Sequence, residues 1–181
     1  MEKKRAILVL EDGTSFTGYS LGAAGETIGE VVFNTSMMGY QEILTDPSYK
    51  GQMVVMTYPL IGNYGINEKD YESRTPFLEG FIVKEYSPFP SNWRSQMSLD
   101  EFLKRKDFDV RSLTKKVQLS PGLVGIDLVK SVTCNDVYEW KDSSQDAAIS
   151  KRYRVVVYDC GVKYNILRKL NSAACSVTVV P

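Results

Sequence analysis

The amino-acid composition excludes the commonest arrangements for nucleophilic catalysis. The 181 residues contain no histidine, so the sequence holds neither a Ser-His nor a Cys-His dyad, and no histidine-ligated metal site. The three cysteines, Cys134, Cys160 and Cys175, lack the Cys-x-x-Cys spacing of zinc and redox sites. Such a sparse, odd set favours a reducing compartment over a disulfide framework. We therefore expect neither a metal site nor a catalytic thiol in these residues.

Two residues have types and positions that invite a chemical role, but the residues alone favour a structural one. Cys160 follows an apolar run, near an expected helix N-terminus of the kind that lowers thiol pKa values. Without a base, a small buried apolar residue is the better interpretation. Ser48 follows Pro47 in a sequence suited to a type I turn, and a turn outweighs a substrate contact. The spacing of the carboxylates near turns does not indicate a general acid and base pair. We therefore expect a capping role or a solvated surface position for each of them, namely Glu11, Asp12, Glu30, Glu42 and Asp46.

The charge balance and the hydropathy pattern argue against nucleic acid and membranes as binding partners. Lys plus Arg (22) equals Asp plus Glu (22), which removes the electrostatic footprint of a general nucleic-acid binder. A hydrophobic fraction of 43% and a charged fraction of 24% are globular proportions. The apolar run at 6–10 is too short for a secretory signal, and no run approaches a membrane span. We expect a soluble cytoplasmic protein without nucleic-acid or membrane partners.

Short strands are the first elements expected to position these residues. Asp12-Gly13 between apolar segments predicts a hairpin of residues 6–10 and 15–21. Gly39 to Leu44 predicts a short helix closed by Asp46-Pro47. Further strands are predicted from β-rich apolar runs at 31–33, 53–58 and 81–83.

Three helices are predicted next. Ser98 and Glu101 form a capping box that begins the first. Asp109 caps a second helix, which carries Val110, Leu113 and Val117. Residues 121–132 have helical periodicity and predict a third, whose buried positions are Leu123, Ile126, Leu128 and Val129.

The hydropathy pattern changes after residue 140. Residues 141–152 are polar and predict a linker. Beyond it, a strand at 154–158, an amphipathic helix at 162–170 and a strand at 177–180 predict a parallel β-α-β unit. Parallel strands are normally covered on both faces, which two strands and one helix cannot achieve. We expect the opening unit of a doubly wound domain whose remainder is absent from this sequence.

Five collinear segments carry a family resemblance that covers essentially the whole chain. The longest is 29–49 (GEVVFNTSMMGYQEILTDPSY), with 10–14 (LEDGT) before it and 57–65 (TYPLIGNYG) after it. Residues 109–114 (DVRSLT) and 158–168 (YDCGVKYNILR) follow in order. Together they resemble the small, glutamine-hydrolysing subunit of carbamoyl phosphate synthetase.

The resemblance implies a mixed α/β fold. Residues 1–140 would form the family's N-terminal swivelling β/β/α-type domain, 141–152 the linker, and 153–181 the start of a class I glutamine amidotransferase domain. The whole protein would hydrolyse glutamine and pass ammonia to a large subunit. That partner would use bicarbonate, ATP and a divalent metal to make carbamoyl phosphate for arginine and pyrimidine synthesis. In this family the serine of the Asp-Pro-Ser-Tyr element contacts glutamine, which moves the interpretation of Ser48 toward a substrate contact.

The sequence departs from the family pattern in two respects. The family's catalytic Cys, in a Gly-x-Cys-x-Gly element, and its His and Glu partners lie beyond position 181, so these residues alone are expected to be inactive and without a cofactor. The junctions Lys106-Asp107 and Val117-Gln118 are short for the family. A non-catalytic module that only docks onto the large subunit is the alternative, and an independent enzyme using Cys160 is a weaker third.

Overall fold

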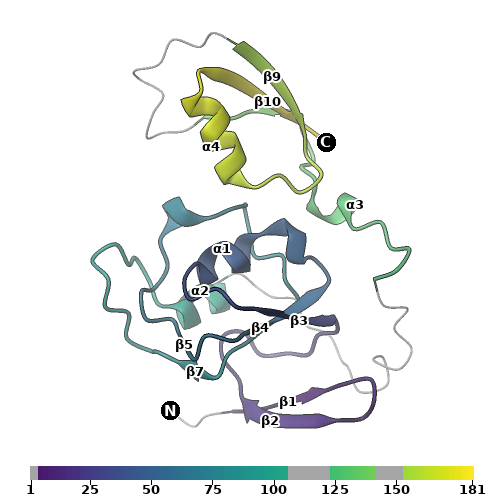
Figure 1. Cartoon of the computed structure of the whole chain (residues 1–181), viewed down its shortest axis with the longest axis vertical. Coiled ribbons are helices and arrows are strands. Elements are labelled where there is room, and N and C mark those ends of the chain that lie inside the picture. The colour runs from purple at the N-terminus through teal and green to yellow at the C-terminus, as the bar shows by residue number, and fades with distance from the viewer. Residues whose placement is uncertain (1–3, 106–122, 142–152) are drawn as a thin grey trace.

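The computed structural model describes residues 4–105, 123–141 and 153–181. Figure 1 shows two parts, which we call the N-terminal unit (residues 4–105) and the C-terminal unit (residues 138–141 and 153–181). A segment of residues 123–137 leads from one to the other. The described part is a mixed α/β structure with several small sheets, which agrees with the predicted fold class at that level.

The predicted hairpin is confirmed. Strands β1 (Arg5–Val9) and β2 (Ser15–Tyr19) pair antiparallel. Gly13 adopts the left-handed conformation that the turn requires, with φ of 85°. The carboxylate of Asp12 accepts the amide of Thr14 at 2.8 Å, which fixes the turn. In Figure 1 the hairpin lies at the end of the N-terminal unit remote from the C-terminal unit.

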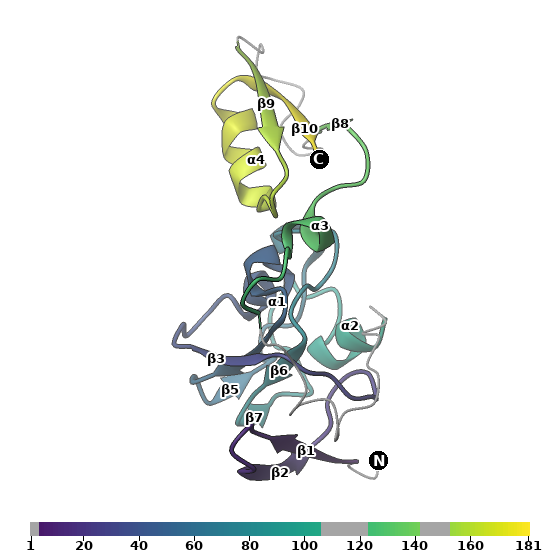
Figure 2. The ribbon, with the colours of Figure 1, turned by 90° about the vertical axis from the view of Figure 1, so that its right-hand side faces the viewer.

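A parallel three-stranded sheet forms the centre of the N-terminal unit. Its order is β3 (Glu30–Asn34), β4 (Gln52–Met56) and β6 (Gly80–Ile82), which confirms the three predicted strands. Helix α1 (Tyr40–Thr45) begins after Gly39, as predicted, and leads into the single turn η1 (Pro47–Tyr49). Figures 1 and 2 show α1 on the side of the sheet that faces the C-terminal unit.

Two very short strands of the N-terminal unit escaped the sequence analysis. Strands β5 (Leu60–Ile61) and β7 (Glu85–Tyr86) pair parallel, and the single turn η2 (Glu68–Asp70) lies between them in sequence. Two residues are too few to show a period. Their neighbourhood belongs to one buried cluster with α1 and β4, which includes Tyr40, Leu44, Val54, Ile61, Ile66, Leu99 and Phe102.

The helical predictions had mixed outcomes. Helix α2 (Leu99–Arg105) follows Ser98, whose hydroxyl accepts the Glu101 amide at 3.2 Å. Only half of the capping box forms, because the Glu101 carboxylate pairs with Arg105. The helix predicted after Asp109 lies outside the described residues.

The helix predicted over 121–132 is wrong. Among its described residues, only α3 (Val129–Val132) is helical. Gly125 has a φ of 79°, which a right-handed helix cannot contain. Two of the four positions predicted to be buried, Ile126 and Val129, are exposed. The apolar periodicity therefore did not reflect a helix face.

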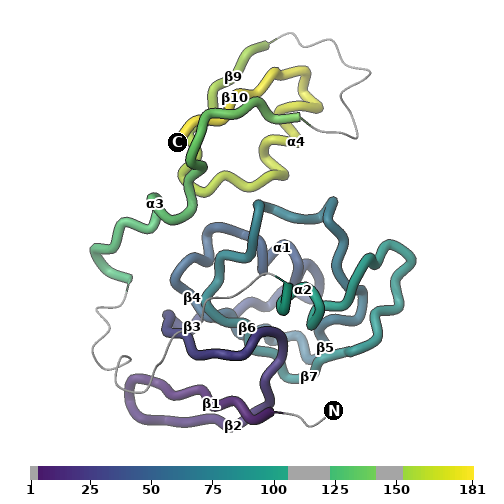
Figure 3. The backbone as a smooth tube through the Cα atoms, turned by 180° about the vertical axis from the view of Figure 1, so that it is seen from behind, coloured from purple at the N-terminus to yellow at the C-terminus, as the bar shows by residue number. Residues whose placement is uncertain are grey.

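The C-terminal unit has the predicted parallel pair. Strands β9 (Tyr153–Tyr158) and β10 (Cys175–Val180) pair in register, with α4 (Tyr164–Ser172) between them in sequence. Strand β8 (Tyr138–Glu139), which the sequence analysis missed, pairs antiparallel on the other side of β10. Figure 3 shows its segment rising from the N-terminal unit to reach this sheet. Leu167, Cys175, Val177 and Val179 form the core between α4 and the sheet.

None of the helices in the described ranges is both long enough and apolar enough to cross a membrane.

Candidate functional site at the junction of the units

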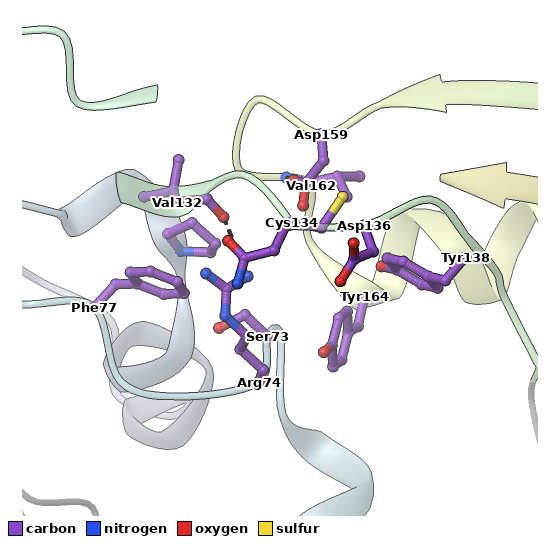
Figure 4. A pocket seen from close by; sticks show the side chains of 12 residues that line it. Ser73, Arg74, Phe77, Val132, Cys134, Asp136, Tyr138, Asp159, Val162 and Tyr164 are labelled. Atoms are coloured by element: carbon purple, nitrogen blue, oxygen red, sulfur yellow. Dashed lines mark hydrogen bonds between the residues drawn. The ribbon is translucent and has the colours of Figure 1, made fainter. Parts of the chain in front are cut away.

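A cavity of about 290 Å³ lies where the two units meet. Its walls come from three parts of the chain. Ser73, Arg74 and Phe77 belong to the N-terminal unit, Val132, Cys134 and Asp136 to the connecting segment, and Tyr138, Asp159, Val162 and Tyr164 to the C-terminal unit. Figure 4 shows Arg74 reaching toward the backbone of Val132, with the rings of Tyr138 and Tyr164 on the other side.

The turn that carries Ser48 lies at this junction. Asp46 is buried, and its Oδ1 atom accepts the amide of Ser48 at 2.9 Å. Pro47, which lines the cavity, begins the turn with a fixed φ. Ser48 itself is exposed. The sequence prediction of a tight turn is thus confirmed, and the turn holds the serine at the edge of the junction.

Lys163 links this turn to the C-terminal unit. Its Nζ atom lies 2.6 Å from Oδ2 of Asp46, so one carboxylate both caps the Ser48 turn and pairs across the junction. The hydrogen bond that the Lys163 ammonium donates to Asp46 raises the pKa of Lys163, outweighing partial burial. The ammonium therefore stays charged at neutral pH. The sequence analysis assigned Asp46 to capping or surface, and only the capping is observed.

Gly161 allows the loop after β9 to approach the Ser48 turn. Its φ is 92°, and a Cβ atom built there would lie 3.1 Å from Cβ of Pro47 and 3.1 Å from Cγ2 of Val132. The loop is further ordered by Asp159, whose Oδ1 atom accepts the amides of Gly161 and Val162 at 3.0 and 2.9 Å. This loop follows the carboxyl end of a parallel strand, where open α/β sheets bind ligands.

Three groups that line the cavity are poor nucleophiles because their pKa values are raised. Burial raises the pKa of the Tyr138 hydroxyl to about 12 and also raises that of Tyr164. Burial, followed by the nearby Asp159, raises the pKa of the Cys134 thiol. All three groups are therefore protonated at neutral pH, and the thiol is not a nucleophile. Arg74 supplies positive charge and donates to the carbonyls of Val132 and Thr133 at 3.4 and 3.3 Å.

Among the described residues, the cysteine and carboxylate candidates give neither a buried thiol at Cys160 nor a metal site. Cys160 is exposed rather than buried as expected, because it follows the exposed end of β9 at the start of the loop. Within residues 4–105, 123–141 and 153–181, no group of three or more Cys, Asp or Glu side chains lies close enough to hold a metal ion.

Sequence reasoning missed the residues that join the units. Glu72 and Tyr71 contact α4, and Arg74 contacts the connecting segment. The partners of Glu72 and Tyr71 are 93 and 97 positions away in sequence. No local spacing could have revealed these contacts, since helical and strand periodicities relate only neighbouring residues.

Comparisons with known proteins agree with the resemblance. Residues 8–125 match the family described as the carbamoyl-phosphate synthase small chain, CPSase domain. The chain is 50% identical over 214 positions to the carbamoyl phosphate synthase small chain of Syntrophotalea carbinolica, covering 98% of this chain and 57% of that protein. It is 46% identical to that of Aquifex aeolicus (99% and 58% covered) and 46% identical to that of Listeria monocytogenes (98% and 54% covered).

The chain thus spans little more than half the length of these relatives. The alignment with the Syntrophotalea protein is also longer than the chain itself, so that relative carries residues with no counterpart here. The two junctions expected to be short, Lys106-Asp107 and Val117-Gln118, lie outside the described residues.

Proposed function

The chain belongs to the carbamoyl-phosphate synthase small-chain family, and from that premise we propose that it is the N-terminal part of a glutamine-hydrolysing subunit. The complete subunit would release ammonia from glutamine and deliver it to a large subunit in the cytoplasm. The large subunit would combine ammonia with bicarbonate, using ATP and a divalent metal, to form carbamoyl phosphate.

We further infer the division of the chain. Residues 1–140 would be the swivelling β/β/α-type domain, 141–152 the linker and 153–181 the start of the class I amidotransferase domain. The pairing of β8 with β10 crosses this boundary, because residues 138–139 fall within 1–140 in sequence but extend the sheet of the second domain. The exposed faces of Val156 and Tyr158 on β9 fit a sheet that further chain covers in the complete subunit.

The proposed chemistry divides between this chain and the rest of the subunit. A thiolate supplied by the later part of the amidotransferase domain would attack the amide carbon of glutamine. The C–N bond would break with release of ammonia, and water would hydrolyse the thioester to glutamate. Ser48 would hydrogen-bond glutamine from the N-terminal domain. This chain alone would have no glutaminase activity.

One observation carries the assignment of Ser48. The turn of residues 46–49 is anchored by Asp46 to Lys163, and it packs on the loop after β9 through Pro47 and Gly161. The exposed residue Ser48 therefore belongs to a turn that packs beside the carboxyl end of a parallel strand, where ligands of such sheets bind. A rigid turn holds a side chain in a fixed position, as a substrate contact requires.

The test uses the complete subunit bound to its large subunit. Glutamine-dependent and ammonia-dependent synthesis of carbamoyl phosphate are measured for the wild type and Ser48→Ala. We expect the variant to have a raised KM for glutamine and unchanged ammonia-dependent synthesis. A wild-type complex that uses ammonia but never hydrolyses glutamine would overturn the proposal and support the docking module instead.

A further inference from the structure

Helix α4 begins without a cap of its own. Its N-cap residue is Lys163, which makes no side-chain capping hydrogen bond and whose ammonium has no acceptor for the free amides of the first turn. Those amides are instead satisfied from the N-terminal unit. The amide of Tyr164 donates to the carbonyl of Glu72 at 2.8 Å, and the amide of Asn165 donates to Oε2 of Glu72 at 3.0 Å.

Glu72 places a negative charge at the positive end of the α4 dipole, which adds to the two hydrogen bonds. One turn further along α4, the guanidinium of Arg168 donates to the carbonyl of Tyr71 at 2.9 Å. We call these contacts of Tyr71 and Glu72 with α4 the clamp.

The clamp is also tied to the turn that carries Ser48. The amide of Glu72 donates to Oγ1 of Thr45 at 2.9 Å, and the hydroxyl of Ser73 donates to the Thr45 carbonyl at 2.5 Å. Thr45 is the last residue of α1 and precedes Asp46. Glu72 therefore contacts the start of the Ser48 turn with its amide, and α4 with its carbonyl and carboxylate.

We propose that Glu72 is a positioning residue for the glutamine site, because it fixes the Ser48 turn relative to the amidotransferase unit. The inference rests on the proposed function, in which Ser48 and the remainder of the site lie on different domains. Contacts shared between two domains need a fixed relative placement, to within about 0.5 Å. The Asp46–Lys163 pair is a second attachment nearby, so loss of the clamp loosens the junction without separating the domains.

The test compares three variants of the complete subunit in complex with its large subunit. Glu72→Ala removes the carboxylate, Glu72→Gln keeps an acceptor oxygen but loses the charge, and Glu68→Ala is the control. Glu68 is the same residue type on the same segment, and its side chain is exposed. Readouts are kcat and KM for glutamine, ammonia-dependent synthesis, and hydrogen exchange at the amides of Tyr164 and Asn165.

We expect Glu72→Ala to raise the KM for glutamine by up to about fivefold, since losing a cap lowers the equilibrium constant for the competent arrangement by about that factor. At saturating glutamine kcat should stay within about twofold, because the reacting groups themselves are unchanged. Glu72→Gln should fall between the wild type and Glu72→Ala. The Glu68→Ala variant should match the wild type, and ammonia-dependent synthesis should be constant throughout.

Hydrogen exchange reports on the clamp independently of activity. The amide of Asn165, which loses its acceptor, should exchange faster in Glu72→Ala than in the wild type or Glu68→Ala. The amide of Tyr164 should change less, because its acceptor is the backbone carbonyl of residue 72, which the variant keeps. A normal glutamine KM in Glu72→Ala, or a KM order other than wild type, Glu72→Gln, Glu72→Ala, overturns the inference whatever the exchange shows. A wild-type complex without glutaminase activity instead overturns the proposed function on which it rests.

Discussion

The ammonium of Lys163 lies 2.6 Å from one oxygen of the Asp46 carboxylate, while the other oxygen accepts the amide of Ser48. One side chain therefore links the loop of the C-terminal unit to the turn of the N-terminal unit. Lys163 is partly exposed and Asp46 is mostly buried, with side-chain exposures of 43% and 11%. Solvent weakens such a pair, so its role is to set geometry more than to stabilise the fold.

A double-mutant cycle tests this pair. Asp46→Asn and Lys163→Met each remove the charge interaction, and we expect a coupling of about 0.5–1 kcal/mol in the unfolding free energy of the complete subunit. Asp46→Ala should cost about 1 kcal/mol more than Asp46→Asn, because it also removes the cap on the Ser48 amide. Strictly additive effects of Asp46→Asn and Lys163→Met in denaturant titrations would show that the pair is not coupled.

Gly161 should tolerate no side chain. Gly161→Ala requires a left-handed backbone and brings a Cβ atom 3.1 Å from Pro47 and Val132. We expect a loss of about 1–3 kcal/mol in unfolding free energy, together with a raised KM for glutamine as the loop moves off the Ser48 turn. Gly18→Ala is the matched control, because its Cβ would meet nothing within 4 Å. Equal stability of the two variants would argue against a tight junction.

Alkaline pH should weaken the junction through Tyr138. Burial raises its pKa from 10.0 in the unfolded chain to about 12 in the folded one. The neutral hydroxyl contributes to the unfolding free energy fully below pH 10. This contribution is lost as pH rises toward 12, because in that window the unfolded state releases the proton more readily than the folded state. The slope of stability against pH in this window should be shallower for Tyr138→Phe than for the wild type. Identical slopes would mean that the hydroxyl is not buried in solution.

The sequence predicted those elements whose signals are local. Asp12-Gly13 specified a hairpin because the turn needs a left-handed residue next to a side chain that caps it. The β-α-β unit was predictable from its continuous apolar strands. The helix over 121–132 was predicted wrongly, because the spacing of apolar residues carries no information about the positive φ of Gly125.

The junction could not be predicted from local patterns. Strand β8 has two residues, and its partner β10 lies beyond the polar segment that follows it. Glu72 and Asn165 are 93 positions apart and meet only because the two units pack together. The placement of Ser48 was predictable as a turn, but its substrate contact came from the family resemblance and remains a prediction.

The hydroxyl of Thr45 should stabilise the junction by a hydrogen bond that can be removed almost without changing shape. Thr45 is buried, and its Oγ1 atom donates to the Gln41 carbonyl at 3.0 Å while accepting the Glu72 amide at 2.9 Å. Thr45→Val keeps the volume but leaves the Glu72 amide without this acceptor, which should cost about 1–3 kcal/mol.

Thr45→Ser is the matched comparison for that substitution. It keeps the hydroxyl and loses a methyl group, worth about 0.8 kcal/mol. We therefore expect Thr45→Val to be the less stable variant in denaturant titrations, although it has the more apolar side chain. Thr45→Val should also speed hydrogen exchange at the Glu72 amide, whereas Thr45→Ser should leave it protected. The reverse order of stability would show that packing of the methyl group, rather than the hydrogen bond to Glu72, holds this corner of the junction.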